Sequence, residues 1–183
     1  FLDLGETYGN IQNTNFTIPY TNTYPDNDQG NDMYERLTTQ YSAIRDINQV
    51  NNALSSLISI NFVGGQDYEK LERARKLNES EYTLHSQLGY ISLNQALNND
   101  EVLAVAFQYT IGNETFQVGE LTTNGPNAPD ALIVKLLKGT TFSPSLINWE
   151  LMMKNIYALG AYQMSNNEFV LDVVYENTEE SGG

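Results

Sequence analysis

The densest group of candidate ligand residues forms an acidic loop early in the chain. Asp26, Asp28 and Asp32 alternate there with Asn and Gln around a Gly, and oxygen atoms at this spacing resemble a loop that wraps a hard cation such as Ca²⁺. The twelfth position counted from Asp26 is Leu37, where an EF-hand requires a bidentate Glu. The motif is therefore incomplete, and two interpretations stay open: part of a calcium loop, or a polar loop ending in a helix cap at Asp32. We assign no metal site.

Residues for acid–base or nucleophilic catalysis are scattered. His85 is the only histidine and no G-x-S-x-G elbow surrounds a Ser, so a triad would depend on one strand-end His. A glycosidase needs two carboxylates at a defined spacing across a cleft, and the alternative for exposed acids is solvated surface. The acids considered are Glu69, Glu72, Glu79, Glu81, Asp100 and Glu101. Gly64-Gly65 lacks the Lys and Ser or Thr of a phosphate loop. We predict no catalytic or cofactor-binding residues, and a protein that is not an enzyme.

The composition of the chain excludes nucleic acid as a partner. The 183 residues carry a formal net charge of −14, which repels phosphate backbones and disfavours an anionic membrane surface. There is no Cys, so disulfide and thiol chemistry is impossible. A chain of this length buries roughly 70% of its unfolded surface, enough for one real core. The sequence begins at Phe1 without a Met and shows no signal peptide or long apolar run, which predicts a processed chain or an excised segment.

The strongest periodic signal is an alternation of apolar and polar residues. It predicts strands over Tyr90–Leu93, Val102–Tyr109 and Thr115–Val118, the second of them central because both of its faces are largely apolar or small. Asn98–Glu101 supplies turn residues, and Gly112-Asn113 is a pair typical of two-residue hairpin turns. A strand over Glu81–Leu84 leads into this region.

Two amphipathic helices are expected. The first spans about 32 to 57, where apolar residues recur at intervals of three and four, with Asp32 as its cap and a possible break at Asn51-Asn52. The second follows Pro144 and spans about 145 to 164. Its stripe of Trp and Met residues is interpreted as core in preference to a partner groove.

These elements predict an α+β fold. We expect a mainly antiparallel β-sheet built on residues 82–120 and extended by 131–137 and 169–175, with the two amphipathic helices packed against it. Residues 59–63 are a further expected strand, and 67–77 suit either a helix or an exposed strand. The predicted core is Leu37, Tyr41, Ile44, Leu54, Leu93, Leu103, Val105, Phe107, Leu136, Trp149, Met153, Ile156, Leu171 and Val173.

The domain organisation follows from the same pattern. Residues 1–31 are expected to be mostly irregular, because Pro19, Pro25 and many Asn, Thr and Gly residues interrupt any period. Residues 32–175 are expected to form a single α+β domain. The acidic residues 176–183 are expected to be a disordered tail.

Several long runs resemble one known family. They are ARKLNESEYTLHSQLGYISLNQALNNDEVLAVAFQYTIGNETFQVGE (74–120), LIVKLLKG (132–139), WELMMKNIYALGAYQM (149–164) and LTTQYSAIRDINQVNNAL (37–54). Together they make the chain similar to the SprA/Sov family, the giant outer-membrane translocon of the type IX secretion system in Bacteroidota, required for gliding motility in many members. The first 31 residues carry no firm resemblance.

The resemblance implies a soluble segment of a much longer polypeptide that otherwise forms a large transmembrane β-barrel. It supplies no catalytic residue. It implies a non-enzymatic module, associated with the outer membrane and exposed to the periplasm or the cell exterior. The implied partners are the rest of the parent polypeptide, other secretion-system proteins and exported cargo. We expect no nucleic acid partner and no membrane insertion by this segment, since it lacks a lipid-facing strand series.

A competing hypothesis comes from the tyrosines. The chain has 12 Tyr, and exposed rings such as those of Tyr8, Tyr20 and Tyr24 could stack on sugars. A cell-surface adhesin or carbohydrate-binding module is therefore the alternative function.

Overall fold

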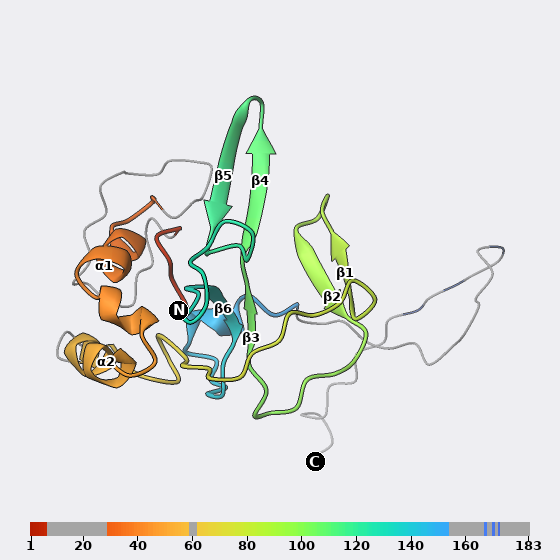
Figure 1. Cartoon of the computed structure of the whole chain (residues 1–183). Helices are drawn as coiled ribbons and strands as arrows, with labels where there is room; N and C mark the ends of the chain where they lie inside the picture. Colours follow the sequence, from red (N-terminus) through yellow and green to blue (C-terminus); the bar gives the residue numbers. More distant parts are fainter. Residues whose placement is uncertain (7–28, 59–61, 154–166, 168–169, 171, 173–183) are drawn as a thin grey trace, which may run out of the picture. The chain divides into compact units, whose positions relative to one another are not determined.

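A computed structural model of the chain describes residues 1–6, 29–58, 62–153, 167, 170 and 172 (Figure 1). The contacts divide the chain into two compact units, Phe1–Met152 and Met153–Gly183. The helices and strands of the described residues belong to the first unit. Most of the predicted strand at 169–175 and most of the predicted helix at 145–164 lie outside the described residues.

The predicted helix over 32–57 is three short helices: α1 (Met33–Thr39), the 3-10 helix η1 (Ser42–Arg45) and α2 (Val50–Ile58) (Figure 1). The prediction of one long helix is wrong because Asp46 is extended, with φ −86° and ψ 121°. Its carboxylate accepts a hydrogen bond from the Asn48 N–H at 2.8 Å, a local bond that competes with the helical ladder. The break lies there, whereas the expected Asn51-Asn52 break falls inside α2.

The start of α1 is capped by a different residue from the one predicted. Asp32 makes no side-chain cap bond, and its carboxylate instead accepts a hydrogen bond from the Arg36 side chain at 2.8 Å. The Met33 N–H donates to Asn31 Oδ1 at 2.8 Å. Asn31 therefore satisfies the first free amide of the helix, as Asn side chains at helix starts do.

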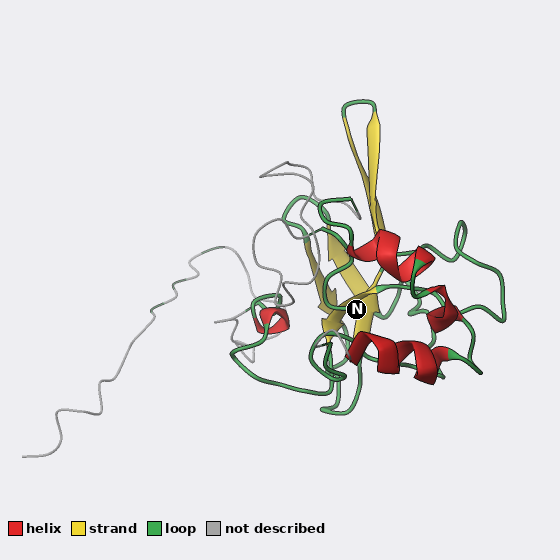
Figure 2. Ribbon diagram, turned by 90° about the vertical axis from the view of Figure 1, so that its left-hand side faces the viewer, coloured by secondary structure: helices red, strands yellow, loops and turns green. Residues whose placement is uncertain are grey.

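The strands pair antiparallel, which confirms the α+β class (Figure 2). Instead of the single sheet predicted, the described residues form three two-stranded sheets. The pairs are β1 (Tyr82–His85) with β2 (Tyr90–Leu93), β3 (Leu103–Val105) with β6 (Lys135–Lys138), and β4 (Phe107–Ile111) with β5 (Glu114–Val118). The expected hairpin turn at Gly112-Asn113 is confirmed, with Ile111 opposite Glu114.

The predicted strand Val102–Tyr109 is split because its two halves have different partners. β3 pairs with β6 and β4 pairs with β5, and the chain passes from one sheet to the other at Ala106. Gly119, at φ +73°, lies close to Ala106: a Cβ built on this glycine would be 3.3 Å from the Ala106 Cβ. Small residues at both positions permit this approach.

Two further predicted elements differ. The described part of the second predicted helix, 145–153, contains only the 3-10 helix η2 (Ile147–Trp149). The segment before η2 forms turns. There the Leu146 N–H donates to the Ser143 carbonyl, and the Ser145 N–H donates to Ser143 Oγ. Residues 67–77 are neither helix nor strand, apart from a bridge between Gly64 and Tyr68.

The core gathers residues from the beginning, middle and later part of the first unit. Its cluster comprises Leu4, Met33, Leu37, Ile44, Ala53, Phe62, Tyr68 and Ile133. Residues 1–6 have no regular structure, yet Leu2 and Leu4 are buried. No periodicity in residues 1–6 indicates this burial.

The predicted core residues differ in how deeply they are buried. Leu37, Ile44 and Leu136 are buried as expected, and Tyr41 and Leu54 pack against the cluster while partly exposed. Leu93, Leu103, Val105 and Trp149 are only partly buried. Phe107 and Met153 are exposed, which contradicts the prediction. Ile156, Leu171 and Val173 lie outside the described residues.

Candidate interaction surface

Glu120 is a buried acidic side chain that accepts hydrogen bonds from three residues distant in the sequence. It follows β5 and Gly119, and is 5% exposed. Its Oε1 accepts a hydrogen bond from the Tyr34 hydroxyl at 2.8 Å and pairs closely with Arg45. Its Oε2 accepts from Arg45 Nη1 at 2.8 Å and from the Ile133 N–H at 2.8 Å. One carboxylate therefore joins α1, η1 and the segment before β6 to the end of β5.

The electrostatics of Glu120 favour its ionised form. Burial alone would raise its pKa, but the hydrogen bonds from Arg45, Ile133 and Tyr34 outweigh burial and hold the pKa below its ordinary value. The same contact raises the pKa of Arg45. Both carboxylate oxygens are occupied by groups of the chain, so Glu120 acts as a structural junction and is poorly placed to exchange protons with a substrate.

A second polar network attaches the first residues of the chain to β6. The Phe1 amine donates to the Val134 carbonyl at 2.9 Å, and the Leu136 N–H donates to the Phe1 carbonyl at 2.5 Å. Lys135 Nζ donates to the Leu2 carbonyl at 3.0 Å and forms a close ion pair with Glu6. These bonds hold residues 1 and 2 alongside β6.

Asp3 belongs to this network and is electrostatically unfavourable as a carboxylate. It accepts hydrogen bonds from the Gly5 N–H at 2.8 Å and from Asn31 Nδ2 at 3.1 Å. Burial and the neighbouring Glu6 nevertheless raise the pKa of Asp3 from 3.8 to about 6. Burial and the negative charge of Glu6 both disfavour the ionised form of Asp3.

The β1–β2 hairpin presents apolar side chains to solvent. Leu84 is 60% exposed and Leu88, in its turn, is 76% exposed. His85 stacks on Tyr90, with ring centroids 4.2 Å apart, so the predicted strand-end histidine contacts an aromatic ring. Before the hairpin, Arg75 pairs with Glu81, and hydrogen bonds from Arg75 and Asn78 lower the pKa of Glu81 to about 2.

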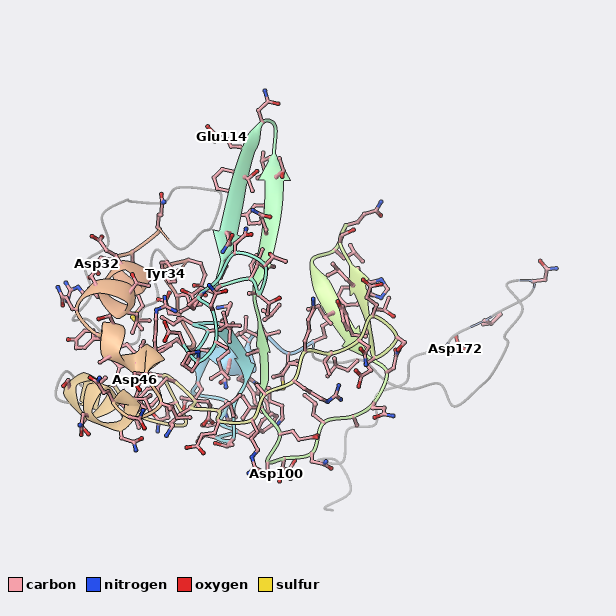
Figure 3. All side chains as sticks on the ribbon, viewed as in Figure 1. Asp32, Tyr34, Asp46, Asp100, Glu114 and Asp172 are labelled. Atoms are coloured by element: carbon pink, nitrogen blue, oxygen red, sulfur yellow. The ribbon has the colours of Figure 1, made fainter. Side chains whose placement is uncertain are left out.

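The β4–β5 hairpin also displays apolar side chains. Phe107 and Ile111 are exposed, while the rings of Tyr109 and Phe116 lie opposite each other with centroids 5.5 Å apart. Glu114 lies beside the turn at the tip of the ribbon (Figure 3). We call the exposed apolar side chains of these two hairpins, Leu84 and Leu88 on β1–β2 and Phe107 and Ile111 on β4–β5, the candidate interaction surface.

The predicted acidic candidates have separate partners. Glu69 accepts bonds from the Thr140 N–H and hydroxyl, Glu72 pairs with Lys70 at 3.0 Å, and Glu101 accepts from the Asn98 N–H. Glu79 and Asp100 are exposed. Among the residues that the structure describes, these carboxylates do not converge into a group that could hold a metal ion.

The candidate calcium loop is only partly described. Asp32 lies at the start of α1 and pairs with Arg36 (Figure 3), whereas Asp26 and Asp28 lie outside the described residues. Tyr8, Tyr20 and Tyr24, on which the carbohydrate hypothesis depends, lie outside them too. Both hypotheses stay predictions.

Sequence reasoning did not identify Glu120 or Arg45. The available signal was weak: Glu120 is an acid placed directly after an alternating strand and a Gly, where burial of the strand end could have been suspected. Arg45 lies within a run of helical periodicity, which does not indicate its pairing with Glu120. The pairing joins residues 75 positions apart, and no local pattern encodes such a distance.

Comparison with known proteins adds no relative. No protein-family model, curated protein or solved structure matches the chain. Within the described ranges, none of the helices is long and apolar enough to cross a membrane.

Proposed function

We propose that this chain is a non-enzymatic module of a large outer-membrane protein-export channel of the SprA/Sov type, which offers surface to partner subunits or passing cargo. The observation that carries the proposal is the resemblance of residues 74–120, the longest of the similar runs. In the structure this run forms both hairpins of the candidate interaction surface. Resemblance and exposed apolar side chains thus fall on the same stretch.

The geometry of the hairpins supports a binding role. A ribbon of two strands is marginal in water by itself and gains stability by packing on further structure. Apolar side chains that the fold leaves in solvent are available for such packing, as Leu84 and Leu88 are. The net charge of −14 suppresses nonspecific adhesion to other acidic proteins, which suits a surface that cargo meets briefly.

The test places charge on this surface within the full-length channel, in cells that use it for export. Leu84→Lys combined with Leu88→Lys is compared with Thr83→Lys combined with Gln87→Lys. The control pair adds the same charge to exposed polar positions of the same hairpin. The readout is the amount of an exported enzyme in the medium, normalised to channel abundance in the outer membrane.

The proposal predicts that the leucine variant exports several-fold less enzyme at equal channel abundance, while the control pair exports normally. The proposal is wrong if the leucine variant exports at the normal level, or if both pairs reduce export to the same extent.

A further inference from the structure

One backbone edge of β4 is open throughout the part of the chain that the structure describes. β4 pairs only with β5, and the pair Ile111–Glu114 flanks the two-residue turn. In such a hairpin the flanking pair is hydrogen-bonded and the bonding alternates along the ladder. The N–H and C=O groups of Gln108 and Thr110 therefore point away from β5, and no further backbone hydrogen bond reaches them within the described residues.

This edge carries no proline and no charged side chain, two of the features that protect an exposed strand from pairing. The sequence of β4 is FQYTI, without Lys, Pro, Gly or any charge, and such edges pair readily with other strands. Four of its five residues are exposed. The outer edge of β5 is less accessible, because that strand ends in the fully buried Val118.

The side-chain pattern of β4 is the same read in either direction: apolar, polar, apolar, polar, apolar. We propose that β4 pairs antiparallel with β4 of a second copy of this chain, about a two-fold axis at Tyr109. Gln108 then lies opposite Thr110 of the second copy, and their outward N–H and C=O groups form two pairs of hydrogen bonds. Phe107 lies opposite Ile111 of the second copy, so apolar residues meet apolar residues.

Charge repulsion and a small interface both limit the affinity of this dimer. Each copy carries a net charge of −14, which opposes association, but β4 itself places no charge in the interface. Repulsion between distant charges is screened beyond about 8 Å at physiological salt. Two short strands form a small interface, so we expect a weak dimer with a Kd on the order of 10 to 100 µM that tightens as salt is raised.

The first test measures molar mass by sedimentation velocity from about 5 to 500 µM protein, the range that brackets this affinity. Thr110→Pro removes an N–H that points out of the β4 edge and leaves the bonds to β5 intact. Thr115→Pro is the matched control, because Thr115 faces Thr110 in the ladder and its N–H points out of the opposite edge. We expect the unchanged chain to dimerise, Thr110→Pro to weaken dimerisation about tenfold, and Thr115→Pro to leave it unchanged.

The second test checks the register. Gln108→Lys with Thr110→Lys brings two like charges together across the axis and should abolish the dimer. Gln108→Lys with Thr110→Glu brings opposite charges together at the same positions and should restore it. Both positions are exposed, so neither pair of substitutions removes a core contact.

A constant monomer mass over the whole concentration range would overturn the proposal. So would equal effects of the two proline substitutions, or failure of the Lys–Glu pair to associate better than the Lys–Lys pair. These outcomes concern the isolated chain alone and leave the proposed export function to its own test.

Discussion

Glu120 shows how one side chain can hold distant segments together. Its oxygens accept four hydrogen bonds from residues on three segments, and all four donors belong to the chain. A buried ion pair of this kind contributes modestly while intact, but removing one partner leaves the other charge uncompensated. The stability of the first unit should therefore be sensitive to this position.

We predict that Glu120→Gln lowers the free energy of unfolding by about 2–4 kcal/mol, because Arg45 loses its counter-charge in a largely buried site. Urea denaturation at neutral pH measures the loss. Glu81→Gln is the matched control: it neutralises an acid in the solvent-exposed pair with Arg75, where solvent screening makes the expected loss much smaller. Equal losses would show that burial of the Glu120 pair has no energetic consequence.

Asp3 should make stability depend on pH. Its pKa in the folded chain is about 6, against 3.8 for an unperturbed Asp, so the folded state binds its proton more tightly than the unfolded state. The stabilisation is complete below about pH 3.8 and is lost as the pH rises through 6. The difference of about two pKa units corresponds to roughly 3 kcal/mol.

Asp3→Asn removes this titration while keeping an oxygen acceptor. We expect the variant to gain stability relative to the unchanged chain as the pH rises from 4 to 7, measured by urea denaturation across that range. Glu81 should make the free energy of unfolding depend on pH in the opposite direction, because its pKa is lowered to about 2. Its contribution is present above pH 4.5 and disappears as the pH falls toward 2. A stability difference for Asp3→Asn that does not vary with pH would contradict the assignment.

At the scale of elements, the passage between the two sheets depends on Gly119. Gly119 and Gly112 both have positive φ, but a Cβ at Gly112 would meet no atom within 4 Å, whereas at Gly119 it would crowd Ala106 and Val105. Strain alone costs about 1 kcal/mol. Crowding against neighbouring atoms adds to it.

We therefore predict that Gly112→Ala destabilises the chain by about 1 kcal/mol and Gly119→Ala by about 2–3 kcal/mol. Thermal or urea unfolding of the two variants measures the difference directly. Losses of the same size would mean that the close approach of Gly119 to Ala106 does not constrain the passage from β3 to β4.

The sequence predicted those elements whose cause is local. The Gly112-Asn113 turn and the strands on either side follow from turn chemistry and alternation within ten residues, and the structure contains them. The split at Ala106 could not be predicted, because it results from a choice between β6 and β5 as partners. The break at Asp46 was missed because the apolar spacing continues across it, while the local hydrogen bonds of one Asp decide the backbone.

At the scale of the molecule, the core depends on residues that no periodicity identified. Leu4 is fully buried in the same cluster as Leu37 and Ile133, so the first six residues complete a core built mainly by α1, η1 and α2. The two hairpins remain largely solvent-exposed by comparison. The first unit thus divides into a small connected core and two exposed hairpins.

Amide hydrogen exchange followed by NMR, in dilute solution under native conditions, tests this division most directly. The Glu120 N–H donates to the Ile133 carbonyl, and the Ile133 N–H donates to the Glu120 carboxylate. The Leu136 N–H donates to the Phe1 carbonyl. These three amides should exchange among the slowest. The outward amides of Gln108 and Thr110 should exchange orders of magnitude faster. Comparable rates for the two sets would contradict the central claim that a connected core supports open ribbons.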